Sequence, residues 1–152
     1  MSKKVILFDI DGTLANGDHR EHLYKGRDHT SWPEFIAASI HDEPHVEIQW
    51  LNHIIAKQED VYIIVLTARS ESGRALTEQW LAKHDIVYHE IILKPEVEAI
   101  AMVKDYIFKE RVLNDLIAQG LTPFMVFEDR QNVVDMWRNR GIKCLQVQPG
   151  DF

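Results

Sequence analysis

The stretch V-I-L-F-D-I-D-G-T, residues 5–13, decides the fold of this chain. Its four consecutive apolar residues predict a strand that is buried on both faces, as in a parallel sheet. Two carboxylates, Asp9 and Asp11, follow this strand directly, and Gly12 permits a tight turn after them. Paired acids at the end of a buried strand are unfavourable unless a cation or a proton compensates them. The stretch therefore predicts a central strand with a ligand site at its carboxyl end.

The remaining apolar runs predict strands that alternate with helices. Further buried strands are expected at residues 60–67, 89–93, 124–127 and 145–147. Helices are expected between them, at about residues 32–39, from Pro44 onward, and at 73–84, 97–119 and 133–137. This alternation is typical of an α/β fold, with a mostly parallel sheet and helices on both faces.

The domain organisation follows from the length and from one polar insertion. A chain of 152 residues fits a single domain, residues 1–152. Residues 15–30 are polar and predict an irregular loop, and S-W-P-E at residues 31–34 has the form of a helix capping box. We expect the inserted segment, about residues 17–58, to form a small cap over the carboxyl ends of the first two strands.

Composition limits the partners and the compartment. The formal net charge of −7 argues against a broad basic surface for duplex nucleic acid, although a local basic cleft stays possible. Cys144 is the one cysteine, so an internal disulfide cannot form, and a reducing, cytoplasmic location is expected. No apolar run approaches the roughly 20 residues of a membrane span, and we expect neither a leader peptide nor a membrane partner.

Polar side chains follow the ends of several predicted strands. These residues are Asp9 and Asp11, Thr67 and Arg69, and Glu128 and Asp129. If the strands are adjacent, the side chains converge on one crevice at the carboxyl edge of the sheet.

Oxygen ligands in this crevice suit Mg²⁺, which prefers carboxylates, carbonyls and water. We expect both Asp9 and Asp11 to lie against the ion. Asp9 and Asp129 are the candidate carboxylate ligands, and a backbone carbonyl of the first loop is a third ligand. Glu128 either supports these ligands or reaches the metal itself.

A lysine is predicted to complete the crevice. Ile100, Lys104, Ile107 and Phe108 recur at helical spacing, so that Lys104 lies on an otherwise apolar helix face. Such a lysine needs an anionic partner, and Asp9 or a phosphate would serve. The alternative is a lysine that extends to solvent at the edge of the stripe.

These residues together fit phosphoryl transfer. Asp9 is the candidate nucleophile, which would form an aspartyl-phosphate. Asp11 is the candidate general acid/base, first for the leaving oxygen and then for the hydrolytic water. Lys104 and the Thr67 hydroxyl, with backbone N–H groups of the first loop, would neutralise the charge of the phosphoryl oxygens.

D-I-D-G-T, L-T-A-R, Lys104 and E-D-R, in this order, resemble the four motifs of the haloacid dehalogenase (HAD) superfamily of phosphatases. The resemblance covers nearly the whole chain and is weakest in the cap. It implies a Rossmann-like core, an aspartyl-phosphate intermediate and a dependence on Mg²⁺.

Two segments resemble a narrower family, the 3′-phosphatase domain of bacteriophage polynucleotide kinase/phosphatase. They are the C-terminal residues 127–152 and M-V-K-D-Y-I-F at residues 102–108. The resemblance implies a 3′-phosphate on a nucleic-acid end as the substrate, and places Arg69 where that family has a substrate-facing arginine. Lys94 and Ile100 stand where many of these domains have an arginine and, four residues before the motif lysine, an acid. No G-x-x-x-x-G-K-[ST] motif of a kinase occurs in the sequence.

Some candidates and alternatives remain open. Arg20, Lys94 and Arg130 are further candidate substrate ligands, although Arg130 also suits a bracing role. Trp32 in the cap is a candidate to stack on a base, with core packing as the alternative. The net charge favours a small-molecule phosphatase, such as a nucleotidase. A phospho-accepting receiver domain also fits an acidic pocket with threonine and lysine, but it would carry its phosphorylated aspartate on a later strand.

Overall fold

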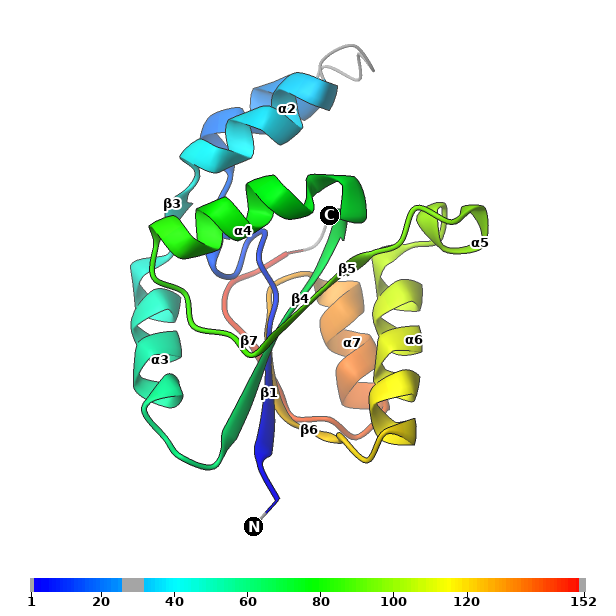
Figure 1. Cartoon of the computed structure of the whole chain (residues 1–152). Coiled ribbons are helices and arrows are strands. Elements are labelled where there is room, and N and C mark those ends of the chain that lie inside the picture. Colours follow the sequence, from blue (N-terminus) through cyan, green and yellow to red (C-terminus); the bar gives the residue numbers. More distant parts are fainter. Residues whose placement is uncertain (1, 26–31, 151–152) are drawn as a thin grey trace.

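A five-stranded parallel sheet forms the centre of the computed structural model, which describes residues 2–25 and 32–150 (Figure 1). The strand order is β5-β4-β1-β6-β7, and each neighbouring pair is parallel. The bounds are β1 Lys4–Phe8, β4 Val61–Ser70, β5 Glu90–Lys94, β6 Pro123–Glu128 and β7 Cys144–Gln146. The stretch at residues 5–13 thus opens on the central strand, and the predicted α/β fold is confirmed.

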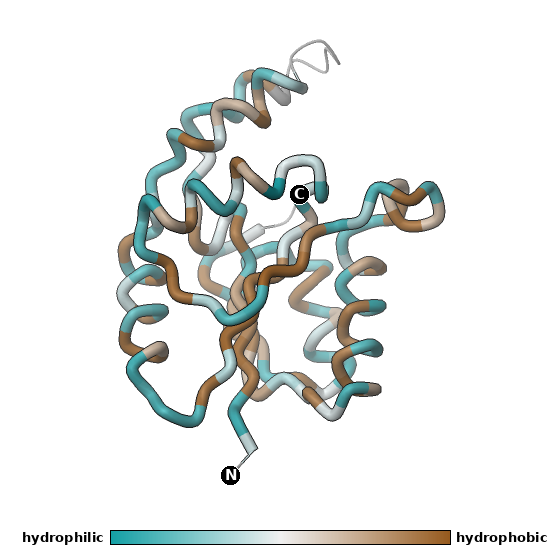
Figure 2. Tube along the Cα trace, viewed as in Figure 1, coloured by the Kyte–Doolittle hydropathy of each residue, from teal (hydrophilic) through white to brown (hydrophobic). Residues whose placement is uncertain are grey.

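Helices cover both faces of the sheet. The bounds are α1 Glu21–Lys25, α2 Trp32–Ala38, α3 Val46–Ala56, α4 Arg74–Lys83, α5 Glu98–Ala101, α6 Asp105–Ala118 and α7 Gln131–Asn139. Side chains alternate along a strand, so Val5 and Leu7 pack with α6 and α7 while Ile6 and Phe8 pack with α3 and α4. Figure 2 shows the apolar residues concentrated along the central strands and on the inner sides of the helices.

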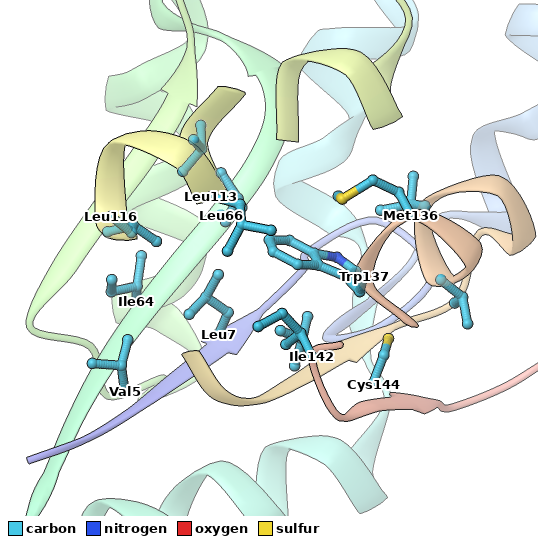
Figure 3. Close-up of a cluster of buried hydrophobic side chains, with 14 of the residues drawn as sticks. Val5, Leu7, Ile64, Leu66, Leu113, Leu116, Met136, Trp137, Ile142 and Cys144 are labelled. Atoms are coloured by element: carbon cyan, nitrogen blue, oxygen red, sulfur yellow. The ribbon is translucent and has the colours of Figure 1, made fainter. Parts of the chain in front are cut away.

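The layer between the sheet and α6 and α7 is built around Trp137, which is fully buried. Figure 3 shows its indole between Leu66 of β4, Leu113 of α6 and Ile142, the residue that precedes β7 by two positions. A buried aromatic ring of this size is a large part of the apolar area removed from water. The strands β1 and β6, which carry the acidic residues, pair directly, and this layer covers one face of both.

The cap that the inserted segment forms is smaller than predicted. The strands β2 (Ala15–Asn16) and β3 (Glu43–Pro44) pair antiparallel and close the base of a cap that contains α1 and α2. Helix α3 lies outside this cap, because Ile48 is buried in the sheet core and Leu51 and Ile55 pack against it. The cap predicted for residues 17–58 therefore ends near residue 44.

Local structure in the cap also departs from the prediction. The expected irregular loop at residues 15–30 contains β2, a 3-10 turn at Asp18–Arg20 and α1. Ser31 of the predicted capping box lies outside the described residues. Figure 1 shows α2 at the end of the molecule toward which the carboxyl ends of the strands point.

The helix predicted over residues 97–119 is broken. It consists of α5 and α6, and Lys104, the last of the three residues between them, has extended backbone angles (φ −64°, ψ 153°) as the N-cap of α6. A continuous face from Ile100 to Phe108 therefore does not exist, which changes the assignment of the site lysine.

Candidate active site

The two acidic loops of the site follow adjacent strands. Phe8 of β1 pairs with Phe127 of β6, and the next backbone N–H, that of Asp9, donates to the Phe127 carbonyl at 3.1 Å. Asp129 follows β6 directly and is buried. The parallel register thus brings Asp9 and Asp129 to one edge, as the sequence predicts.

Gly12 allows the first loop to approach Asp129 closely. Its φ is +84°, and a Cβ atom added there would lie 2.0 Å from Oδ2 of Asp129. Only glycine adopts this backbone region without a steric penalty and leaves that space open. The D-x-D-G-T turn is therefore shaped around the Asp129 carboxylate.

Three carboxylates, those of Asp9, Glu128 and Asp129, form a buried cluster that could hold a cation. Each has an oxygen within 4.8 Å of an oxygen of the other two. Oδ2 of Asp129 is buried and has no hydrogen-bond donor in the described part of the chain. A buried carboxylate oxygen without a partner is costly, and a hard cation would compensate it. The all-oxygen donor set fits a cation such as Mg²⁺ or Ca²⁺.

The ionisation of this cluster is strongly perturbed. Burial, and then the charge of Glu128, raise the pKa of Asp9 to about 8 even though Lys109 lies beside it. Burial and the charge of Asp9 raise the pKa of Asp129 to about 7. The cluster therefore favours a proton or a cation over three free negative charges.

Lys109, and not Lys104, is the lysine of the site. Its Nζ donates to Oδ1 of Asp9 at 2.9 Å and to Oε2 of Glu128 at 2.8 Å, and the side chain is buried. Burial alone would lower the pKa of Lys109, but the charges of Asp9 and then Glu128 raise it. Lys104 is exposed, so the prediction for it is wrong.

A signal for Lys109 was present in the sequence. Many of the phosphatase domains that the sequence resembles have an acid four residues before the motif lysine, and Asp105 stands four residues before Lys109. The apparent departure at Ile100 came from assigning the lysine five residues too early, on a helix assumed to be continuous.

Glu128 holds its neighbours in the cluster in place and is less available as a metal ligand. Its Oε2 accepts from Lys109 at 2.8 Å, and its Oε1 accepts from the backbone N–H of Asp129 at 3.1 Å. Both oxygens thus already have donors. The Thr13 hydroxyl lies 3.4 Å from a carboxylate oxygen of both Asp9 and Asp129 and bridges the two loops.

The Asp11 carboxylate points away from the cluster and pairs with two arginines. Arg69 donates through Nε at 2.9 Å and Nη2 at 2.7 Å, and Arg20 donates through Nη2 at 3.0 Å. Desolvation alone would raise the pKa of Asp11, but Arg69 and then Arg20 lower it to about 2. The predicted residues Asp11, Arg69 and Arg20 therefore lie together, with guanidinium groups beside the candidate acid/base.

Asp42, which the sequence did not single out, anchors Arg20. Its carboxylate is fully buried and accepts from Arg20 Nε at 2.7 Å and Nη2 at 2.8 Å. His19 lies 2.8 Å from the same carboxylate, and Arg69 Nη2 lies 3.5 Å from it. This bidentate pair joins two parts of the cap, and the Arg69 contact links them to β4.

The other predicted side chains occupy distinct places. Thr67 is buried in β4, and its hydroxyl oxygen accepts from the Arg69 backbone N–H at 3.1 Å, which leaves its proton for a ligand. Lys94 and Arg130 both pair with Asp105, at 3.6 Å and 2.7 Å. Asp105 thus braces the two cations beside the site, a role that sequence reasoning missed because it read Lys104 as the motif residue.

The strand order and the site define a phosphatase of the HAD superfamily. Residues 3–152 match the family of the polynucleotide kinase PNKP phosphatase domain, so the chain belongs to that family and is a phosphatase domain. In the described residues, no helix has the length and apolarity that crossing a membrane requires.

Related proteins agree with this assignment. A protein of Autographa californica nuclear polyhedrosis virus, described as a bifunctional polynucleotide kinase/RNA ligase, is 26% identical over 137 residues, which are 90% of this chain and 18% of the viral protein. A chain solved in the Pnkp1/Rnl/Hen1 RNA repair complex has a TM-score of 0.79 at 28% identity, over 99% of this chain and 44% of that chain. This chain therefore spans less than half of both relatives.

More distant structures share the fold. A hydrolase from Streptococcus pneumoniae has a TM-score of 0.64 at 12% identity, over 98% of this chain and 95% of that chain. At this identity the likeness concerns the fold alone, and it confirms the HAD core.

Proposed function

We propose that this domain is a Mg²⁺-dependent phosphomonoesterase that removes 3′-phosphates from nucleic-acid ends through an aspartyl-phosphate on Asp9. The observation that carries the proposal is the position of Asp9. Its buried carboxylate lies between Lys109, 2.9 Å away, and the acidic group of Asp129, whose Oδ2 has no donor among the described residues.

Asp9 and Asp129 would hold the ion through carboxylate oxygens, and the backbone carbonyl of Asp11 would complete the protein ligands. The backbone carbonyls of Ile10 and Gly12 already accept hydrogen bonds, which favours the Asp11 carbonyl for this role among the described residues of the first loop. When bound, Mg²⁺ would polarise the phosphoryl group and reduce the repulsion between it and the carboxylates.

In the first step, a carboxylate oxygen of Asp9 attacks phosphorus and the bond to the leaving oxygen breaks. Asp11 gives a proton to that oxygen, so the product leaves as an alcohol. In the second step Asp11 takes a proton from water, which attacks phosphorus. Inorganic phosphate leaves, and the Asp9 carboxylate is restored.

The positive groups of the site would stabilise the phosphoryl oxygens in both steps. Lys109 contacts Asp9 at 2.9 Å, and Thr67 is buried in β4, the strand that pairs with β1. Arg69 and Arg20 bind the Asp11 carboxylate in this structure, and a phosphate group is also a bidentate partner for a guanidinium group. Transfer of these arginines to the substrate would release Asp11 to carry a proton.

The substrate class rests on the relatives. The viral protein is named a polynucleotide kinase/RNA ligase, and the solved chain belongs to an RNA repair complex. Both names concern nucleic acid, which supports a polynucleotide 3′-phosphate. One observation favours a second candidate, a small-molecule phosphatase: the net charge is −7, which disfavours nucleic-acid binding through phosphate contacts.

The strand order sets the receiver alternative aside. If only the five strands of the parallel sheet are numbered, in chain order, their order across the sheet is 3-2-1-4-5. Receiver-like folds have the order 2-1-3-4-5. The strand β4, beside β1, carries Thr67 in place of a phosphorylated aspartate.

The substrate is tested by Mg²⁺-dependent phosphate release from four compounds in parallel. They are a 3′-phosphorylated oligonucleotide, its 5′-phosphorylated twin, and 3′- and 5′-mononucleotides, with Asp9→Asn as the control. We expect the 3′-phosphorylated oligonucleotide to lead by about 100-fold in kcat/KM, or roughly 2.7 kcal/mol of discrimination. Equal or faster turnover of the mononucleotides would assign the domain to small molecules.

A further inference from the structure

Residues 146–150, from the last residue of β7 onward, contact both acidic loops of the site. Gln146 Nε2 donates to the backbone carbonyl of Asp129 at 3.0 Å, and Gln148 Nε2 donates to the backbone carbonyl of Gly12 at 2.9 Å. The first contact holds the loop after β6, and the second holds the D-x-D-G-T turn after β1. One short segment therefore joins the two loops that carry the acidic cluster.

Gly150 seats the far end of this segment against the Asp129 loop. Gly150 is buried, and its carbonyl oxygen accepts from the Gln131 backbone N–H at 2.6 Å. A Cβ atom added to Gly150 would lie 2.6 Å from the carbonyl oxygen of Asp129 and 2.8 Å from its carbonyl carbon. Both are backbone atoms, which cannot rotate away as the end of a side chain can. Any other residue at position 150 would therefore displace the segment or the loop.

Close approach, and not an unusual backbone conformation, is the reason for glycine at this position. Among the described glycines, a positive φ occurs at Gly12, Gly120 and Gly141 and not at Gly150. Gly12 leaves room for the Asp129 carboxylate, and Gly150 leaves room for the Asp129 main chain. The loop after β6 is thus held from two sides by residues that have no side chain.

The spacing of the two loops decides how well the acidic cluster can hold an ion. Mg²⁺ requires near-octahedral ligands at about 2.1 Å, whereas Ca²⁺ accepts a more variable set of oxygens at about 2.3–2.6 Å. A displacement of about 0.5 Å in one carboxylate is enough to impair a site of this kind. A change in loop spacing should therefore weaken Mg²⁺ binding more than Ca²⁺ binding.

The simpler alternative is that the segment only closes the start of α7. The Gly150 carbonyl does accept from the N–H of Gln131, which is the first residue of that helix. The Gln148 amide, however, reaches the turn after β1, which is not part of α7. This second contact gives the segment a link to the other acidic loop.

We propose that residues 146–150 hold Asp129 relative to Asp9 at the spacing that Mg²⁺ requires. Gly150 and Gln148 are the two positioning residues of this segment. The proposal rests on the proposed function, because that function needs an ion at these two carboxylates. Since neither positioning residue touches the reacting atoms, both should set the affinity for the ion and leave the chemistry at phosphorus unchanged.

Cation binding by the full, metal-free chain tests the proposal without turnover. Isothermal titration gives the Kd of Mg²⁺ and of Ca²⁺ for Gly150→Ala and Gln148→Met; methionine keeps the length of the side chain but cannot donate. Gly73→Ala is a matched control, because a Cβ there meets nothing within 4 Å. Gln58→Met is the other control, because Gln58 also donates to a backbone carbonyl and is exposed. Urea unfolding checks that each variant is folded.

The two ions should respond differently. We expect Gly150→Ala to raise the Kd of Mg²⁺ about 10-fold or more, as is typical when a group that orients a metal ligand is lost, and the Kd of Ca²⁺ by less than about 3-fold. Gln148→Met should raise the Kd of Mg²⁺ about 3-fold, because it loses one exposed hydrogen bond. Both controls should bind like wild type. At saturating Mg²⁺, phosphate release by both variants should return close to the wild-type rate.

Other results would overturn the proposal. Equal weakening of both ions in Gly150→Ala, or wild-type affinity for Mg²⁺, would leave the segment with no role beyond closing α7. If Gly150→Ala does not fold, an unchanged Mg²⁺ affinity in Gln148→Met contradicts the proposal by itself. Wild-type protein that binds no Mg²⁺ would refute the positioning role together with the metal site. If wild-type protein binds Mg²⁺ and both variants weaken it, but no phosphate is released from 3′ ends, the proposed function fails while the positioning role stands.

Discussion

Lys109 donates to the Asp9 carboxylate at 2.9 Å, from a buried position that it shares with Glu128. This contact joins α6 to the end of β1 and gives the candidate nucleophile a fixed positive neighbour. Lys104, five residues earlier in the sequence, is exposed and cannot take this role.

Lys109→Gln should lower kcat/KM by about 100-fold or more, because the charge that stabilises the phosphoryl oxygens is lost. It should also reduce the free energy of unfolding by about 3–5 kcal/mol, since two buried acids lose their cation. Steady-state kinetics and urea unfolding measure both. Lys104→Gln is the matched control and should stay within about 3-fold of wild type in activity, because it is an exposed surface substitution. A larger loss of activity in Lys104→Gln than in Lys109→Gln would restore Lys104 as the site lysine.

Gly12→Ala should damage the site more than a positive φ alone explains. The new Cβ would lie 2.0 Å from Asp129 Oδ2, whereas a Cβ at Gly120, with φ +79°, would meet nothing within 4 Å. Gly120→Ala isolates the backbone strain, about 1 kcal/mol, and should leave activity intact. Gly12→Ala should also weaken Mg²⁺ activation, measured as the Mg²⁺ concentration for half-maximal rate. Identical behaviour of the two variants would contradict the role given to this turn.

Mg²⁺ should stabilise the protein more at high pH than at low pH. The folded-state pKa values of Asp9 and Asp129 are about 8 and about 7, above the 3.8 of a free carboxyl group. The metal-free folded state thus binds protons more tightly than the unfolded state, and this contribution to stability is greatest in acid and is lost as the pH rises through these values. Protons compete with the metal for the same oxygens.

Thermal unfolding with and without Mg²⁺ at about pH 5.5 and pH 8 measures this effect. At about 100 Kd of Mg²⁺ the stabilisation should approach roughly 2.7 kcal/mol at the higher pH and nearly vanish at the lower one. Asp129→Asn should remove the stabilisation by Mg²⁺ at both pH values. An increment that is the same at both pH values would contradict a metal site on these carboxylates.

Asp42→Asn should loosen the cap. Arg20 would lose the charge of its bidentate partner, whose two contacts are 2.7 Å and 2.8 Å long. Breaking a buried ion pair costs about 3–5 kcal/mol, and the cost should lie toward the lower end here because Arg20 keeps Asp11 as a partner at 3.0 Å. We expect a rise in KM and faster proteolysis between β2 and β3. Glu43→Gln, at the exposed neighbouring position, should change neither; an unchanged Asp42→Asn would mean that the pair does not hold the cap.

The central strand, the sheet class and the acidic loops could be predicted because their signals are local. A run of apolar residues followed by D-x-D-G-T needs no distant contact to be recognised, and the same holds for Glu128 and Asp129 after β6. Lys109 was missed because its face depends on a helix break at Lys104, which an amphipathic pattern does not reveal.

Asp42 and the extent of the cap depend on tertiary contacts. Asp42 becomes important only because Arg20, 22 residues earlier, folds back onto it. Helix α3 was assigned to the cap by its position in the chain, but Ile48 is buried in the sheet core. A pattern within one segment cannot show which surface that segment will cover.

The most direct test of the central claim is to trap phosphate on Asp9. Asp11→Asn is mixed with p-nitrophenyl phosphate, whose leaving group needs no proton, so the first step should proceed while hydrolysis of the intermediate is slow. We predict a burst of p-nitrophenol that approaches one equivalent per site, and peptide mass mapping after acid quench should locate the phosphoryl group on Asp9. Steady turnover without a burst, and with no phosphorylated Asp9 peptide, would contradict the aspartyl-phosphate account.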